Sequence, residues 1–440
     1  MKAPMSTPSG LRRLTREFSW VVAGQAAGTL GALVGVRLLT QALKPAAYGE
    51  IGLGLTLVTL SQQIVFGPLC SATLRSFAPA AERNELTRFF GATKLLFQSA
   101  IGALVGMIAL LGLVLVWSNN ARWLPLLLLV GFLSVLSGYN SMLDGIQNAA
   151  RQRPVVAWHQ GAGQWLRYLL AAAAVLVIGA SSMSAILGYT LGAVLVLGSQ
   201  VTFFRQKIRP LARLEAIPDA RQIRETARGM WNYGWPFAVY GIFTWGQAAS
   251  DRWALQYFRS TADVGLYQVL YQLSYYPVTL ASVLLTQLVT PILFARAGDG
   301  TDSGRIEQAR RMTNIMVAGS VGITLLGVAV MFLVRQPMFS LLVAPEYRTA
   351  SSLAPAMVFA SGVFATGQVA ALNQLTRSAT RALIAPKAVT ACLGTLLNCI
   401  GAWEWGIGGV VAGNAAFSIL YLLWVLGLDN QGHERPVQTA

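Results

Sequence analysis

Apolar runs of 18 or more residues recur along the chain from Phe18 to Leu428, and short polar or basic segments separate them. The hydrocarbon core of a bilayer is about 30 Å thick, so about 20 apolar residues cross it as a helix. The pattern predicts an all-α polytopic membrane protein with about twelve transmembrane helices. Two of the predicted spans lie within Trp231–Ala297, and the other ten are Phe18–Ala42, Tyr48–Leu74, Phe89–Trp117, Trp123–Ala149, Val155–Gly179, Met183–Phe204, Met312–Val334, Ser351–Leu375, Leu383–Ala402 and Ile407–Leu428.

A basic segment, 205–230, follows the sixth span and divides the spans into two equal sets. Its two prolines and dense charge favour a cytoplasmic connector that contains a short amphipathic helix over a folded domain. The predicted organisation is a basic cytoplasmic N-terminus, an N-terminal six-helix lobe, the linker, a C-terminal six-helix lobe and a cytoplasmic tail: 1–17, 18–204, 205–230, 231–428 and 429–440.

Composition agrees with this class. Of the 440 residues, 55% are hydrophobic and 11% are charged, whereas a soluble domain has about 25% charged residues. A net charge of +16 would suggest nucleic acid in a soluble chain. Here the basic residues lie in short loops between apolar runs, so the positive-inside rule explains them and we expect no nucleic-acid partner. The three cysteines are an odd number and predict no disulfide framework.

The distribution of basic residues also predicts orientation. If both termini are cytoplasmic, the cytoplasmic segments hold 25 of the 33 Lys and Arg residues and the outer loops hold five. The remaining three, Arg37, Arg167 and Arg252, lie inside spans. This asymmetry indicates a multi-pass protein with both ends in the cytoplasm.

The stretch Trp231–Ala297 carries the most informative polar residues. Asp251 and Arg252 lie side by side in its first apolar run, and a charge at membrane depth normally faces the protein interior or a wet cavity. Its second run carries polar side chains in steps of three and four, which keeps one helix face polar and is typical of a transporter wall. The residues of this polar stripe are Gln268, Gln272, Tyr275, Thr279, Ser282, Thr286 and Thr290.

The two halves share a weak repeat. The sequence RLLTQALKPAAYGEIGLG begins at Arg37, and RWALQYFRSTADVGLYQVL begins at Arg252. In each copy an intramembrane arginine precedes a turn and a glycine, Gly49 or Gly265. Because the first helix of each half runs in the same direction, the predicted duplication is a parallel repeat.

These two motifs resemble those of polysaccharide transporters, the O-antigen-flippase-like members of the multidrug/oligosaccharidyl-lipid/polysaccharide (MOP) superfamily. The resemblance implies two six-helix lobes around a central cavity in the bacterial inner membrane. It also implies alternating access, by which a polyprenyl-pyrophosphate-linked oligosaccharide for O-antigen, exopolysaccharide or capsule reaches the periplasmic leaflet. The implied partners are this lipid-linked oligosaccharide, membrane lipids, a polysaccharide polymerase and a chain-length regulator. The chain departs from the lipid II flippase branch, which typically has fourteen helices.

The chemistry of such a substrate selects candidate residues. Its pyrophosphate needs cationic donors, and the planar guanidinium of arginine suits phosphate. Its sugars need amides, hydroxyls and aromatic faces. The candidate cavity residues are Arg252, Arg37, Asp251, Arg167, Asp144, Gln247, Gln268, Gln272, Tyr275 and Gln63.

Structural roles stay open for several of these charges. Arg37 and Arg252 lie one to two turns from helix ends and could extend to the lipid headgroups. Asp144 is a candidate ion-pair partner for Arg167, and Asp251 could neutralise either Arg252 or Arg37.

No pattern indicates an enzyme or a cofactor, and coupling to protons or sodium stays open. The rival function is a cation-coupled multidrug exporter of the same superfamily. Such an exporter would favour deep acidic residues, whereas the deep charges here are three Arg and two Asp. A lipid II-type flippase is a further alternative. A purely structural partner in a glycan-synthesis complex does not account for the polar stripe.

Overall fold

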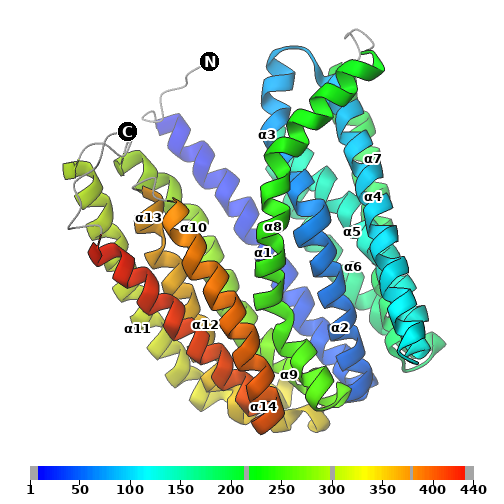
Figure 1. Ribbon diagram of the computed structural model, residues 1–440, viewed down its shortest axis with the longest axis vertical. Helices are drawn as coiled ribbons and strands as arrows, with labels where there is room; N and C mark the ends of the chain where they lie inside the picture. The colour runs from blue at the N-terminus through cyan, green and yellow to red at the C-terminus, as the bar shows by residue number, and fades with distance from the viewer. Residues whose placement is uncertain (1–7, 213–217, 298–302, 377–379, 432–440) are drawn as a thin grey trace. The chain divides into compact units, whose positions relative to one another are not determined.

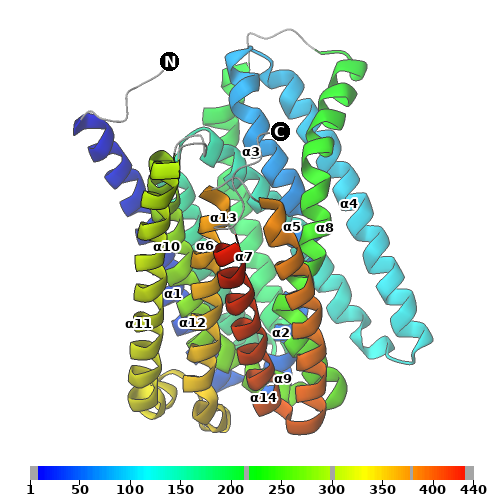
Figure 2. The same ribbon diagram turned by 60° about the vertical axis from the view of Figure 1, so that its left-hand side comes forward.

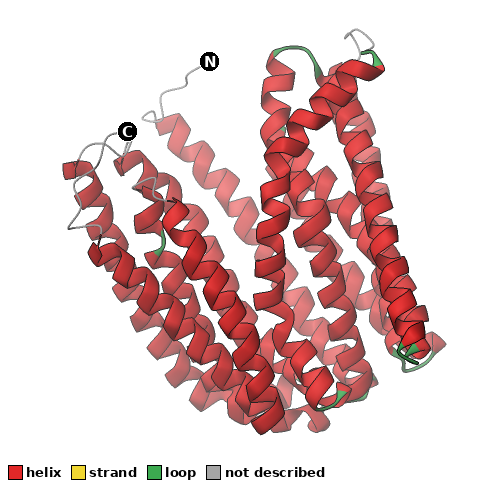
Figure 3. Ribbon diagram, in the orientation of Figure 1, coloured by secondary structure: helices red, strands yellow, loops and turns green. Residues whose placement is uncertain are grey.

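The computed structural model describes residues 8–212, 218–297, 303–376 and 380–431. Within these ranges every regular element is helical (Figures 1 and 3). The chain divides into two compact units, Met1–Leu43 with Leu53–Trp245 and Lys44–Gly52 with Gly246–Ala440. The predicted all-helical membrane fold class is therefore confirmed.

The first unit contains α1, the second half of α2, α3 to α7 and the first half of α8. In it α6 packs between α1 and α7, and α5 packs against α7 and α3. Serine and proline mark several helix starts: Ser181 caps α7 by accepting a hydrogen bond from the Ser184 amide, and prolines lie in the first turns of α3, α5 and α6. The helices are α1 Pro8–Ala42, α2 Pro45–Ser61, α3 Gly67–Glu82, α4 Leu86–Trp117, α5 Leu124–Ala149, α6 Arg153–Ile178 and α7 Ser182–Phe203. A π-helical turn, Gln62–Phe66, joins α2 to α3.

The second unit contains the start of α2, the second half of α8 and everything that follows. In it α12 lies between α11 and α14 (Figure 2). A second π-helical turn, Tyr271–Tyr275, joins α9 to α10. The helices are α8 Ala220–Phe258, α9 Thr261–Leu270, α10 Tyr276–Ala297, α11 Ser303–Leu342, α12 Ala354–Ala370, α13 Leu372–Thr376 and α14 Ile384–Gln431.

Each predicted span coincides with a helix. Ten described segments are long and apolar enough to cross a membrane. One of them, α14, holds two predicted spans, because at Gly406 it leaves helical geometry with φ of 61° and folds back on itself. Arg259 stabilises this reversal by donating from Nε to the Ala402 carbonyl at 2.7 Å and from Nη2 to the Trp403 carbonyl at 2.6 Å. The more polar α8 supplies the remaining span.

Helix α8 changes the interpretation of the central linker. The sequence predicted a connector up to residue 230, but α8 begins at Ala220 and continues to Phe258 without interruption. Its first half packs closely on the α2–α3 segment, since a Cβ atom at Gly241 would overlap the Gln63 carbonyl oxygen. The indole Nε1 of Trp245 also donates to the Thr56 carbonyl at 2.7 Å. The linker therefore ends in a helix that belongs to the first unit.

Candidate functional site

A buried polar network in the second unit surrounds Arg252, whose side chain lies in α8. Arg252 is only 5% exposed. Its Nε donates to Oε1 of Gln268 at 2.6 Å, and its Nη1 donates to Oδ1 of Asp251 at 3.1 Å. The same Nη1 donates to the Ala248 carbonyl at 2.8 Å, and the guanidinium lies 4.1 Å from the ring centroid of Tyr271. Three candidates from the sequence, Arg252, Asp251 and Gln268, are thus brought together.

The network extends through Tyr267 to both halves of α14. The Tyr267 hydroxyl donates to Oδ2 of Asp251 at 2.5 Å and accepts from Nδ2 of Asn414 at 2.8 Å. Nδ2 of Asn398 donates to the Ser250 hydroxyl at 3.1 Å and to Oδ1 of Asn414 at 3.4 Å. Both oxygens of the Asp251 carboxylate therefore have donors. A buried charge pair is stable only with this kind of additional hydrogen bonding.

Sequence reasoning missed Tyr267, Asn398, Asn414 and Ser250 as members of this network. Two of them carried a usable signal, because Asn398 and Asn414 are amides inside apolar spans, where polar side chains normally face a protein interior. They lie on opposite sides of Gly406, sixteen residues apart. Their meeting depends on the reversal of α14, which the sequence indicated only as a boundary between spans.

The two repeat motifs meet within the second unit. A Cβ atom at Gly49 would overlap the Thr261 carbonyl oxygen, and one at Gly265 would overlap the Pro45 carbonyl oxygen. The contact is reciprocal, since each carbonyl belongs to the residue four positions before the opposite glycine. The starts of α2 and α9 therefore cross at backbone distance, which only small residues permit.

Next to this crossing, the Tyr48 hydroxyl donates to Oε1 of Gln272 at 2.6 Å. Tyr48 itself is 2% exposed and its ring meets Tyr347 edge-on at 5.8 Å between centroids. Gln272 lies in the π-helical turn, where Tyr271 and Tyr275 stack at 4.9 Å. Turns of this kind are frequent at functional sites because they realign side chains within a helix.

The stripe predicted on the second run of Trp231–Ala297 lies on its more shielded side. Gln268 and Tyr275 are buried, and Gln272, Thr279, Ser282, Thr286 and Thr290 are half-buried, whereas Val283, Leu285 and Leu288 are exposed. The hydroxyls of Thr279 and Thr290 donate to carbonyls one turn earlier. The polar face of this helical segment therefore lies against protein, and its apolar face is exposed on the surface.

In the first unit the candidates Asp144 and Arg167 do not form the pair that the sequence suggested. The carboxylate of Asp144 accepts from Nε2 of Gln200 at 2.7 Å and from Nε2 of Gln160 at 3.3 Å. The guanidinium of Arg167 instead lies 4.6 Å from the ring centroid of Tyr189. Amides on α6 and α7 lie close enough to hold the acid, and an aromatic ring holds the cation.

Arg37, Gln63 and Gln247 are the least constrained candidates. Arg37 and Gln247 are half-buried and Gln63 is exposed. Within the described ranges, none of their side chains takes part in a recorded hydrogen bond or ion pair. Arg37 and Arg252 occupy corresponding positions in the two motifs. Their environments nevertheless differ, because Arg252 is buried and bonded and Arg37 is not.

The arrangement offers fixed donors and acceptors for binding. Across the part of the chain that the structure describes, no three His, Cys, Asp or Glu side chains are grouped so that they could hold a metal ion.

Solved structures with similar folds were found for nearly the whole chain. The chain matches the lipid II flippase MurJ in an inward closed conformation with a TM-score of 0.72 and 12% identity, covering 93% of this chain and 87% of that one. It matches an inward-facing multidrug resistance MATE family transporter of the MOP superfamily with a TM-score of 0.71 and 13% identity, covering 95% and 100%. A eukaryotic MATE transporter, AtDTX14, matches with a TM-score of 0.61 and 13% identity, over 95% and 96% of the two chains. The chain therefore shares the fold of these transporters.

A family model then gives the family. The model of the polysaccharide biosynthesis protein family matches residues 14–296, nearly two thirds of the chain. The chain belongs to this family of MOP flippases, and the family predicted from the two motifs is confirmed. No curated protein matches the chain.

Proposed function

We propose that this transporter moves a polyprenyl-pyrophosphate-linked oligosaccharide from the cytoplasmic to the periplasmic leaflet of the inner membrane by alternating access. The observation that carries the proposal is the polysaccharide biosynthesis family match, which spans both arginine motifs, from Arg37 to Gly49 and from Arg252 to Tyr267. The product would supply O-antigen, exopolysaccharide or capsule synthesis. A polymerase and a chain-length regulator would then act on it.

The environment of the acids favours this substrate over the cationic solutes of a drug exporter. Asp251 is neutralised by Arg252 and hydrogen-bonded by Tyr267. Asp144 accepts from two glutamine amides. A cationic solute would have to displace these donors. An anionic pyrophosphate needs instead a cation with free donors. Two candidates, Arg37 and Arg167, donate no side-chain hydrogen bond to a described residue, and of these Arg167 already lies against the ring of Tyr189. We therefore assign the pyrophosphate to Arg37.

The test is transport by the purified full-length chain in vesicles. A polyprenyl-pyrophosphate oligosaccharide with a labelled terminal sugar is incorporated, and a glycosidase added outside removes the label only from the outer leaflet. Vesicles with the transporter should lose nearly all label, whereas protein-free vesicles should lose about half, because only their outer leaflet is accessible. A parallel set measures export of a cationic dye. Dye export without lipid-linked sugar movement would refute the proposal in favour of the exporter.

A further inference from the structure

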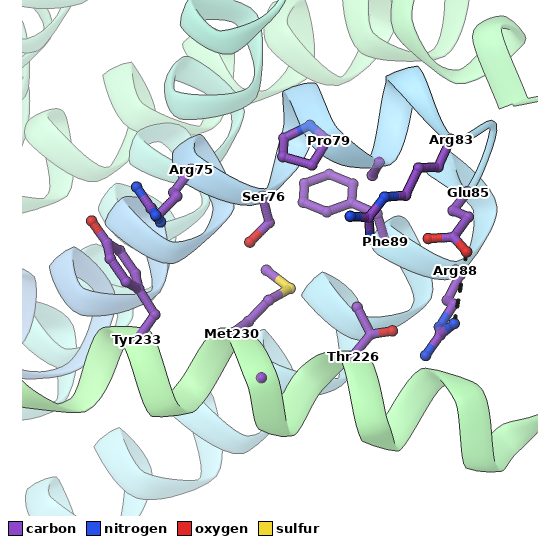
Figure 4. A pocket seen from close by; sticks show the side chains of 12 residues that line it. Arg75, Ser76, Pro79, Arg83, Glu85, Arg88, Phe89, Thr226, Met230 and Tyr233 are labelled. Atoms are coloured by element: carbon purple, nitrogen blue, oxygen red, sulfur yellow. Dashed lines mark ion pairs between the residues drawn. The ribbon is translucent and has the colours of Figure 1, made fainter.

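A basic pocket of about 410 Å³ lies in the first unit, where α3 ends, α4 begins and α8 passes alongside (Figure 4). This volume is within the range of small-molecule sites. Three arginines line it, Arg75, Arg83 and Arg88, against a single acid, Glu85. None of the candidate residues chosen from the sequence, Arg37 and Arg252 included, lines this pocket.

One of the three arginines is committed to structure. Arg88 donates from Nε to the Gln222 carbonyl of α8 at 3.0 Å. Its guanidinium also lies 3.9 Å from Glu85 and 3.8 Å from Glu225. Arg88 therefore ties the start of α8 to the start of α4, and its charge is neutralised.

The other two arginines keep their donors available. The guanidinium of Arg75 lies 5.0 Å from the ring centroid of Tyr233, a contact that leaves its N–H groups open. For Arg83 no hydrogen bond or ion pair is recorded with any described residue. Figure 4 shows Arg83 turned toward the pocket and Arg75 at the opposite end, beside Tyr233. The pocket thus presents two separated, unneutralised cations.

The segments around the pocket indicate that it lies near the lipid headgroups. The apolar segment Pro45–Glu82 ends at it and Leu86–Trp117 begins at it, with only three residues between them. Trp231, Tyr233 and Trp235 follow on α8 and are 44%, 39% and 49% exposed. Exposed tryptophan and tyrosine gather where a protein meets the membrane interface. A ligand that enters this pocket from the interface is a lipid headgroup.

The separation of the cations selects the kind of headgroup. Arg75 and Arg83 are eight residues apart along α3 and its C-terminal turn, which corresponds to about 12 Å of helix rise. A single phosphate bonds one of them. A pyrophosphate, whose phosphorus atoms share one bridging oxygen, spans less of this separation than two phosphates joined through a glycerol. We propose that the pocket binds an anionic membrane lipid with two phosphates separated by a glycerol, of the cardiolipin type, with one phosphate on each arginine. This site does not depend on what the protein transports.

The test is lipid retention by the full-length protein, measured by native mass spectrometry with cardiolipin, phosphatidylglycerol and inorganic pyrophosphate as separate probes. The wild-type protein should bind one cardiolipin at least tenfold more tightly than phosphatidylglycerol. Arg75→Gln with Arg83→Gln should weaken cardiolipin binding by a hundredfold or more, since each charge-assisted contact contributes about tenfold. The matched control, Arg224→Gln with Arg228→Gln, removes the same charge from exposed positions of α8 outside the pocket and should keep the adduct.

A second variant guards against indirect effects. Ser76→Asp leaves both arginines in place but puts a negative charge among the lining residues, and it should also abolish the adduct. Equal cardiolipin binding by wild type and by the double pocket variant would overturn the proposal. So would equal affinity for phosphatidylglycerol, or displacement of cardiolipin by inorganic pyrophosphate, because either result removes the reason for two separated phosphates.

Discussion

The two copies of the repeat agree in their glycines and differ in their arginines. Gly49 and Gly265 make reciprocal backbone contacts at one helix crossing. Arg252 is enclosed by Asp251, Gln268 and two tyrosine rings, whereas Arg37 is half-buried and has no recorded side-chain partner within the described ranges. The repeat thus preserves the packing geometry in both halves. The arginine is buried and bonded in the second copy, whereas in the first it makes no side-chain hydrogen bond or ion pair within the described ranges.

The largest effect is expected from breaking the enclosed charge. Arg252→Gln leaves Asp251 buried without its cation, which costs about 3–5 kcal/mol of unfolding free energy. The double variant, Asp251→Asn with Arg252→Gln, should recover at least half of this loss because no charge remains. Denaturant unfolding in detergent measures both, with Arg224→Gln, at an exposed position of α8, as control. If the double variant is no more stable than Arg252→Gln alone, the loss of stability does not come from leaving Asp251 without its cation.

The next-largest effect on stability is expected at the helix crossing that the two glycines share. Gly265→Ala places a methyl group against the Pro45 carbonyl, so the starts of α2 and α9 must separate, at a cost of about 1–3 kcal/mol. Gly49→Ala should cost a similar amount because the contact is reciprocal.

The control for both is Gly322→Ala in α11, where no atom lies within 4 Å of the added methyl group. This change should leave stability unchanged or raise it by up to about 1 kcal/mol, through better helix propensity. A neutral Gly265→Ala would mean that the crossing is looser in the membrane than in this structure.

Sequence periodicity predicted the helices well because membrane spans are long and nearly uniform in composition. The site was predictable only in part. Asp251 and Arg252 are conspicuous as adjacent charges in an apolar run, and Gln268 was found by its helical spacing. Tyr267 gives no such signal, because a tyrosine within an apolar span is usually interpreted as a residue of the helix-packing core. The role of Asn398 and Asn414 depends on a chain reversal whose geometry no local pattern specifies.

The Asp144–Arg167 pair shows the opposite limit. Spacing and depth made the two residues plausible partners, but the choice between an ion pair and separate neutral contacts depends on helix rotation. Gln200 and Tyr189, both on α7, reach the acid and the cation first. Charged residues inside apolar spans were easy to identify from the sequence, but the sequence did not predict which side chains they contact.

A smaller effect follows from the different partners of Asp144 and Asp251: glutamine amides hold Asp144, whereas an arginine and a tyrosine hold Asp251. Asp144→Asn keeps the shape of the side chain, and Gln200 can reverse its amide to accept from the new one, because its own Oε1 has no partner among the described groups. We expect a change below about 1 kcal/mol, since hydrogen bonds between membrane helices average about 0.6 kcal/mol. Asp251→Asn, measured alongside, should cost several times more. Equal losses for the two variants would show that Asp144 has a cationic partner.

The smallest effect on stability should accompany a large effect on transport. Arg37→Gln removes a side chain without recorded partners, so its unfolding free energy should stay within about 0.5 kcal/mol of wild type. If Arg37 bonds the substrate pyrophosphate, transport of the lipid-linked oligosaccharide should fall about tenfold or more, because a charged hydrogen bond contributes about 1.5–3 kcal/mol. Arg37→Lys should keep part of the activity, since it retains the charge and loses the planar donor pair. The exposed Arg122→Gln is the control for general loss of charge. Unchanged transport by Arg37→Gln at equal protein levels would show that Arg37 does not bind the substrate. The two arginines would then differ in their contacts but not in a transport role.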